Sequence, residues 1–185
     1  ASEVLVNVGL AAGCPVKQAE VHGMSQRGGS VTSHVRWGKV VHSPLIGAGE
    51  VDFLIGFEEL EAARWANYLR PDGIAIVADV VLVPLTVSKN LPYPEWERTK
   101  NILGEYTRNV YLVPAAEIGQ AAGNTRALNV VLLGFLLKFL DIKPEIWREK
   151  IEEKLPSRFI KSSLEAFELG ALSAAKMIAD KEAKK

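Results

Sequence analysis

Cysteine is almost absent from this sequence. Cys14 is the only one in 185 residues, so the chain cannot form an internal disulfide. It also cannot supply the roughly four thiolates that hold an iron–sulfur cluster. A lone cysteine is typical of a reducing compartment, and we expect a cytoplasmic protein.

The chain also lacks an excess of either charge. It has 22 basic residues (Lys and Arg) and 22 acidic residues (Asp and Glu), so no net field attracts nucleic acid or an acidic membrane. No apolar run reaches membrane-spanning length, because Lys138 and Asp141 interrupt the best candidate. We therefore expect neither nucleic acid nor a membrane among its partners.

The middle of the chain alternates between strand and helix patterns. A buried strand is predicted over Val51–Gly56, a helix over Phe57–Leu69 and, after a turn at Arg70–Gly73, a second strand over Gly73–Ala78. This alternation predicts an α/β fold with a mainly parallel sheet and helices on both faces, a Rossmann-like three-layer arrangement with a helical C-terminal end.

Two long helices are predicted in the second half. In the helix over Thr125–Leu140 and the one over Ser162–Lys181, a single stripe is expected to face the core. The stripes consist of Val130, Leu133, Leu136, Leu137 and Leu140, and of Leu164, Phe167, Leu169, Leu172 and Met177. Shorter helices are predicted over Glu3–Ala12, Glu95–Tyr106 and Pro114–Ala122, with another opening at Lys143–Glu145. Further strands are predicted over Pro15–Val21, Ser30–Trp37 and Asn109–Val113, with an irregular one over Val80–Val87.

The stretch Glu20–Gly38, EVHGMSQRGGSVTSHVRWG, concentrates unlike functional groups. Its glycines permit positive backbone dihedrals and expose N–H groups, so the loop can fold tightly around a ligand or a partner. His22 is the best acid–base candidate, because it lies among glycines and polar residues. The alternative is a glycine-rich hairpin connection with incidental polar residues. On the strand that follows, Val31, Ser33, Val35 and Trp37 alternate with Thr32, His34 and Arg36, and one of the two faces is expected to be solvated or to face a ligand.

Ligands of parallel sheets gather at the carboxyl ends of the strands. The loop after Val21 and the segment Gly56–Glu59 are both expected there. Glu58 also suits the first turn of a helix, where a carboxylate caps free N–H groups. The three histidines have no metal-binding spacing, and His34 is expected to be structural.

Beyond these patterns, EVHGMSQRGGSVTSHVRWG closely resembles the signature of the gamma subunit, or gamma domain, of 2-oxoacid:ferredoxin oxidoreductases. The resemblance continues in Val51–Gly73, Gly123–Gly134 and Ser163–Gly170. Within that family it is most similar to the small beta subunit of the indolepyruvate enzyme. Residues 1–185 are expected to form a single domain of this type, without the N-terminal strand and GxGGQG-type loop with which family members usually begin.

The resemblance implies a subunit without cofactors of its own, inactive alone, in a complex that oxidatively decarboxylates an aryl pyruvate to an acyl-CoA and CO2 while reducing ferredoxin. Thiamine diphosphate and [4Fe-4S] clusters are expected in a large partner subunit, and CoA is the co-substrate. No residue is assigned a catalytic role. The candidates for contact with substrate, CoA or partner are Glu20, His22, Gly23, Met24, Ser25, Gln26, Arg27, Gly28, Gly29, Arg36 and Glu58.

Three alternatives stay open. The first is a gamma subunit that serves pyruvate, 2-oxoglutarate or a branched 2-oxoacid. The second is a purely architectural subunit, and the third is a stand-alone nucleotide-binding module. A stand-alone nucleotide-binding module would need a glycine loop and an acidic ribose-binding residue, and neither is found in the sequence.

Overall fold

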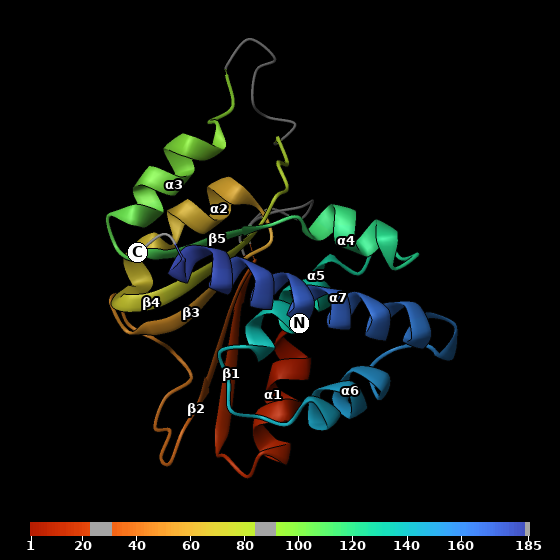
Figure 1. Ribbon diagram of the computed structural model, residues 1–185. Coiled ribbons are helices and arrows are strands. Elements are labelled where there is room, and N and C mark those ends of the chain that lie inside the picture. The colour runs from red at the N-terminus through yellow and green to blue at the C-terminus, as the bar shows by residue number, and fades with distance from the viewer. Residues whose placement is uncertain (23–30, 84–91, 184–185) are drawn as a thin grey trace.

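A computed structural model describes residues 1–22, 31–83 and 92–183. Helices and strands alternate over residues 51–121, and the last third of the chain is helical (Figure 1). The elements are α1 (Ser2–Ala11), β1 (Val16–His22), β2 (Val31–Trp37), β3 (Val51–Gly56), α2 (Glu59–Arg64), the 3-10 helix η1 (Ala66–Tyr68), β4 (Leu69–Ala78), α3 (Trp96–Gly104), β5 (Asn109–Val113), α4 (Ala115–Ala121), α5 (Leu128–Leu137), α6 (Pro144–Glu152) and α7 (Ser157–Glu182).

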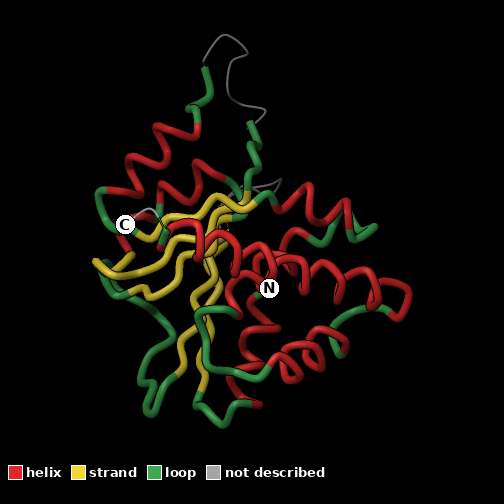
Figure 2. Tube along the Cα trace, in the orientation of Figure 1, coloured by secondary structure: helices red, strands yellow, loops and turns green. Residues whose placement is uncertain are grey.

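The centre of the fold is a parallel sheet of three strands in the order β3-β4-β5. Along the central strand β4, Ile76 and Ala78 point to the side of α5 and α7, whereas Ala75 and Val77 point to the side of α2 and α3. Successive strand residues alternate between faces, so a continuous apolar run is buried on both. The predicted α/β class, parallel sheet and helical C-terminal end are confirmed (Figures 1 and 2).

β1 and β2 form a separate antiparallel hairpin. Among the described residues β1 pairs only with β2, so it is not a strand of the parallel sheet. The loop that was expected at the carboxyl edge of that sheet lies outside the described residues. Helix α1 packs closely on this hairpin through Gly9: a methyl group there would lie 2.8 Å from both Trp37 and Val16. Strand periodicity predicts that these segments are strands, but it does not indicate that α1 packs against Trp37.

Two predicted boundaries changed for identifiable reasons. The expected helix over Phe57–Leu69 is shorter, and Arg70–Gly73 is an irregularity within β4 rather than a turn before it, since the register with β3 shifts there. In the described part of Val80–Val87 no strand forms. The Val80 carbonyl instead accepts a hydrogen bond from the Glu59 N–H (3.1 Å), and the Val80 N–H donates to Ala78 (2.8 Å).

A further correction concerns the buried faces of helices α5 and α7. Helix α5 is buried on all sides from Val130 to Leu137, not along one stripe, because it lies between the sheet and the other helices. On α7 the predicted core residue Leu172 is 65% exposed, whereas Phe167 is buried. The residues that α7 buries are mostly small: Ser163, Ala166, Phe167, Gly170, Ala171 and Ala174. Small side chains let the two helices approach closely, which shifts the buried stripe away from the large leucines.

Candidate functional site

Most of the predicted glycine loop lies outside the described residues. Gly23, Met24, Ser25, Gln26, Arg27, Gly28 and Gly29 belong to this group. His22 ends β1, where its backbone pairs with Val31 across the hairpin. The described part of the site therefore begins at the flanks of the loop.

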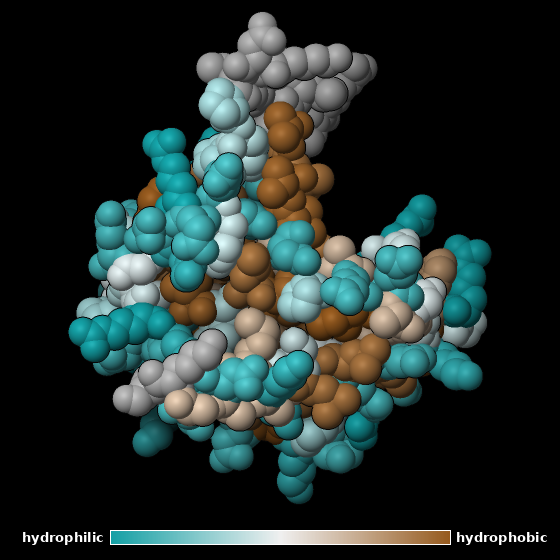
Figure 3. Space-filling model, turned by 45° about the horizontal axis from the view of Figure 1, so that its top comes forward, coloured by the Kyte–Doolittle hydropathy of each residue, from teal (hydrophilic) through white to brown (hydrophobic). Residues whose placement is uncertain are grey.

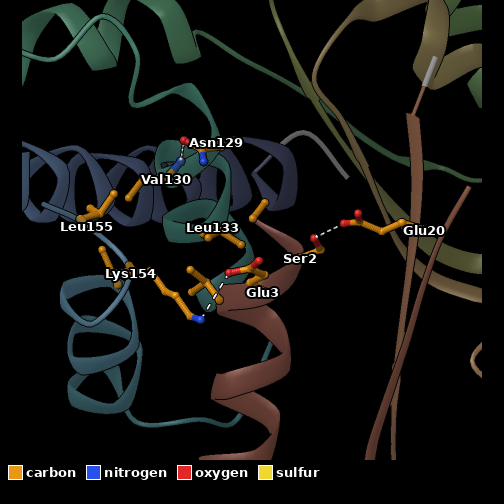
Figure 4. A pocket seen from close by; sticks show the side chains of 11 residues that line it. Ser2, Glu3, Glu20, Asn129, Val130, Leu133, Lys154 and Leu155 are labelled. Atoms are coloured by element: carbon orange, nitrogen blue, oxygen red, sulfur yellow. Dashed lines mark hydrogen bonds and ion pairs between the residues drawn. The ribbon is translucent and has the colours of Figure 1, made fainter. Parts of the chain in front are cut away.

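Glu20, on β1, holds the hairpin to the first turn of α1. Its Oε1 accepts hydrogen bonds from the hydroxyls of Ser2 (2.9 Å) and Ser33 (3.1 Å). The side-chain amide of Gln18 donates to the same oxygen (3.1 Å). Figure 4 shows the Ser2–Glu20 bond bridging α1 and β1. A carboxylate that accepts several hydrogen bonds is fixed in orientation, so the contacts of Glu20 in the described chain are structural.

A pocket of about 300 Å³ opens beside Glu20 (Figure 4). Glu3 lies on one wall, and its carboxylate is 3.3 Å from the Lys154 ammonium. The lining residues come from α1, β1, α5 and the end of α6, and they are Ala1, Ser2, Glu3, Val4, Glu20, Asn129, Val130, Leu133, Ile151, Lys154 and Leu155. The pocket combines an apolar floor with a few charged groups at its rim.

Arg36 is used to hold the loop over residues 38–50 against the hairpin. Its guanidinium donates to the Leu45 carbonyl (3.2 Å) and lies 3.7 Å from the Glu50 carboxylate. Two positions earlier on the same strand, His34 accepts a hydrogen bond at Nδ1 from the Ile46 N–H (3.1 Å) and packs edge-on against Tyr68. The face that carries His34 and Arg36 is thus partly covered by the chain's own loop.

Glu58 lies at the carboxyl end of β3, as predicted. Its side chain is buried and caps α2 by accepting a hydrogen bond from the Glu61 N–H (2.8 Å). Its other oxygen accepts one from the Tyr93 hydroxyl (2.7 Å). Burial raises the pKa of Tyr93, and this hydrogen bond raises it further, so the phenol stays protonated and donates. No sequence pattern pointed to Tyr93, since the two residues are 35 positions apart.

The neighbouring Glu59 is an unusual carboxyl group. Its residue is only 7% exposed, and burial raises the pKa of Glu59, with the negative charges of Glu58 and Asp79 adding to the effect. Asp79 directly follows β4, and a carboxylate at the end of a buried strand is the one signal that could have identified it. The carboxyl edge of the sheet thus gathers three acids from two strand ends.

Exposed apolar side chains follow the same two strand ends. We name Phe57, Val81, Leu82 and Val83 the carboxyl-edge surface; they are between 41% and 66% exposed. They follow β3 and β4, and the Glu59–Val80 hydrogen bond joins the two segments. Figure 3 shows a band of apolar side chains on one side of the molecule. Exposed apolar groups gathered at one edge are typical of a protein interface.

Removing the carboxylate of Glu58 tests its structural role. Glu58→Ala is expected to lower the free energy of unfolding by about 2 kcal/mol, because one cap and one buried hydrogen bond are lost. Tyr93→Phe should cost about 1 kcal/mol alone and much less in the Glu58→Ala background. Urea denaturation of the two single variants and the double variant measures this. Strictly additive effects would contradict the pairing.

The raised pKa of Glu59 predicts a pH-dependent stability change. The folded protein holds the Glu59 proton more tightly than the unfolded chain does. Ionisation therefore favours unfolding: the cost is absent below the unfolded pKa, grows as pH rises through it, and is complete above the folded pKa. Glu59→Gln removes this cost, so it should raise the free energy of unfolding near neutral pH, with the gain vanishing in acid.

The measurement is chemical denaturation of the unmodified protein and of the Glu59→Gln variant, from acidic to neutral pH. Glu165→Gln, an exposed position on α7, is the matched control and should be neutral at each pH. A Glu59→Gln effect that does not change with pH would refute the prediction.

The described side chains do not meet the requirements of a metal site. Within residues 1–22, 31–83 and 92–183, no group of three or more His, Cys, Asp or Glu is arranged to hold a metal ion. Over the same part of the chain, none of the helices is both long and apolar enough to cross a membrane.

Comparison with known proteins identifies the class to which this fold and site belong. Residues 1–173 match the family described as pyruvate ferredoxin/flavodoxin oxidoreductase, and the chain belongs to this family. Solved structures share the fold. The gamma subunit of a keto/oxoacid ferredoxin oxidoreductase from Geobacter sulfurreducens superposes with a TM-score of 0.67 at 14% identity, covering 95% of this chain and 89% of that one.

A second structure places the same fold inside a longer chain. The 2-oxoglutarate:ferredoxin oxidoreductase from Magnetococcus marinus, solved with 2-oxoglutarate, coenzyme A and succinyl-CoA bound, matches with a TM-score of 0.68 at 17% identity. The match covers 95% of this chain but only 28% of that one. In that enzyme the fold is therefore one part of a larger polypeptide.

Sequence relatives within this family share one name. The chain is 35% identical over 182 residues to indolepyruvate oxidoreductase subunit IorB of Pyrococcus horikoshii, covering 96% of this chain and 90% of the relative. It is 36% identical over 172 residues to the protein of the same name from Archaeoglobus fulgidus, covering 91% and 85%.

Proposed function

We propose that this chain is the small subunit of an indolepyruvate:ferredoxin oxidoreductase of the cytoplasm. The observation that carries the proposal is the 35% identity to subunit IorB along nearly the full length of both chains. The complex would oxidatively decarboxylate an aryl pyruvate in the presence of CoA. The products would be an acyl-CoA and CO2, and the electrons released would reduce ferredoxin.

The cofactors of this reaction would reside in a large partner subunit. Thiamine diphosphate supplies the decarboxylation chemistry, and [4Fe-4S] clusters carry the electrons. The residues of this chain do not fit a cluster, because Cys14 is its only cysteine. This chain would instead bind the large subunit and help to enclose the site where the 2-oxoacid and CoA enter.

Two parts of the chain suit that role. The carboxyl-edge surface offers apolar contact area for the large subunit, since exposed Phe57 and Leu82 would be shielded from water on assembly. The Glu20–Gly29 segment offers polar contacts: Arg27 can form paired hydrogen bonds to a carboxylate or phosphate, and glycine N–H groups lie beside it in the sequence.

Co-expression with the large subunit tests the proposal. The complex should reduce viologen with indolepyruvate and CoA far faster than with pyruvate, 2-oxoglutarate or a branched 2-oxoacid. Neither subunit should do so alone, and the isolated chain should show no iron–sulfur absorbance. A preference for another 2-oxoacid would overturn the substrate assignment, and full activity of the large subunit alone would overturn the role of this chain.

A further inference from the structure

Helix α7 exposes a leucine next to the residues that it buries. The residues that it buries against α5 include Ala166, Phe167 and Gly170. Leu169 and Leu172 lie beside these residues, and Leu172 is 65% exposed. Leu169 is partly buried against the core, so Leu172 is the leucine of α7 that remains open to solvent, where another surface could cover it.

Leu169 and Leu172 of α7 lie on one wall of a groove, and α4 forms the other wall. The two helices lie side by side (Figure 1), and the open groove between them measures about 360 Å³. Ile118 and Ala121 contribute from α4 at the spacing of one helix face, as Leu169 and Leu172 do from α7. The groove is thus lined by apolar side chains from two neighbouring helices.

The charges at the groove make it complementary to itself. Glu117 belongs to the α4 wall and Lys176 to the α7 wall. Both are exposed, and neither makes a hydrogen bond or an ion pair with the described residues. In a two-fold symmetric interface each residue meets its counterpart in reverse, so Glu117 of one copy can face Lys176 of the other on both sides of the axis. Because Glu117 and Lys176 lie on opposite walls of the groove, a two-fold axis can bring each one opposite its counterpart in the second copy.

We propose that the α4–α7 groove is an interface between two copies of this chain, with the Leu172 side chains near the two-fold axis and reciprocal Glu117–Lys176 pairs at the edges. Burying leucine from both copies would supply the attraction, and the charge pairs would fix the register. The inference goes beyond the proposed function, because it concerns self-association and not the reaction or the large subunit.

Sedimentation of the full chain over a range of concentrations, without the large subunit, tests the proposal. The chain should form dimers. Leu172→Glu should weaken dimerisation at least about thirtyfold, because it places two like charges at the axis. Glu117→Lys and Lys176→Glu should each weaken it about tenfold, since each reversal acts twice in a symmetric dimer. The double reversal should restore the dimer to within a few-fold, which mere damage to the fold would not do.

Matched controls lie elsewhere on the surface. Leu10→Glu on α1, where the leucine is 53% exposed, and Glu145→Lys at the start of α6 should leave dimerisation unchanged. Circular dichroism confirms that each variant is folded. A chain that remains monomeric at high concentration overturns the proposal, as does a double reversal that fails to restore the dimer. If Leu172→Glu instead abolishes binding of the large subunit to a monomeric chain, the groove belongs to that partner and the proposal is wrong.

Discussion

Gly134→Ala and Gly170→Ala are each expected to destabilise the protein by about 3 kcal/mol or more. Helices α5 and α7 cross at these two glycines. A methyl group at Gly134 would overlap the carbonyl oxygen of Phe167, and one at Gly170 would overlap that of Val131. Both obstacles are backbone atoms within buried helices, so neither can rotate away.

A loss of this size is a large fraction of the stability of a typical domain. For a chain of this length it should lower the melting temperature by roughly 6–12 °C. Thermal unfolding followed by circular dichroism measures it. The two substitutions affect one contact, so the double variant should fall short of the sum of the single effects.

Gly104→Ala is the matched control. Gly104 ends α3, is exposed, and has no neighbouring atom within 4 Å of an added methyl group. Alanine is favoured over glycine in helices by up to about 1 kcal/mol, so this change should be neutral or stabilising. If all three variants had the same melting temperature, the close crossing of α5 and α7 would not be the cause of the lower stability.

Arg27→Lys is expected to leave the complex assembled but to lower its catalytic efficiency with the 2-oxoacid or CoA. This expectation rests on the sequence and on the proposed function, because Arg27 lies outside the described residues. A guanidinium forms two parallel hydrogen bonds to a carboxylate or phosphate, and the lysine ammonium cannot copy that planar geometry. The loss should be about 2–4 kcal/mol of transition-state stabilisation, or roughly 30- to 700-fold in kcat/KM.

Subunit affinity must be measured on the same variant. If Arg27 pairs with a carboxylate of the large subunit, Arg27→Lys should loosen assembly and leave turnover of the intact complex nearly normal. Arg70→Lys is the control: Arg70 forms a surface ion pair with Asp52 at 3.0 Å, and such pairs contribute little. A variant normal in both affinity and turnover would show that Arg27 is ordinary surface.

The sequence by itself determined the local structure and the family. The bounds of β3 and β5 follow from apolar runs that end at Gly56 and before Pro114, and Pro144 marks the first turn of α6. These signals are local, since glycine and proline limit the backbone at their own positions whatever the rest of the chain does. The strand and helix alternation was enough to give a parallel sheet covered on both faces.

At the candidate site, the sequence located Glu58 at the start of a helix but not its partner. The Glu58–Tyr93 hydrogen bond joins segments 35 residues apart, and no periodicity carries information over that distance. The same holds for Arg36, whose alternation on β2 suggested an open face. Its contacts with Leu45 and Glu50 arise because the following loop folds back over the strand.

Only the tertiary structure decided which apolar faces are buried and against what. Helical spacing placed Leu172 on a core stripe, but the close crossing at Gly134 and Gly170 turns the small residues of α7 inward and leaves Leu172 exposed. Likewise, periodicity identified β1 and β2 as strands, whereas only the tertiary structure shows that they form a hairpin separate from the parallel sheet and that α1 packs on it at Gly9. A periodic apolar pattern shows which face of a helix or strand is apolar. Which segment packs against that face depends on the shape of residues that are distant in the sequence.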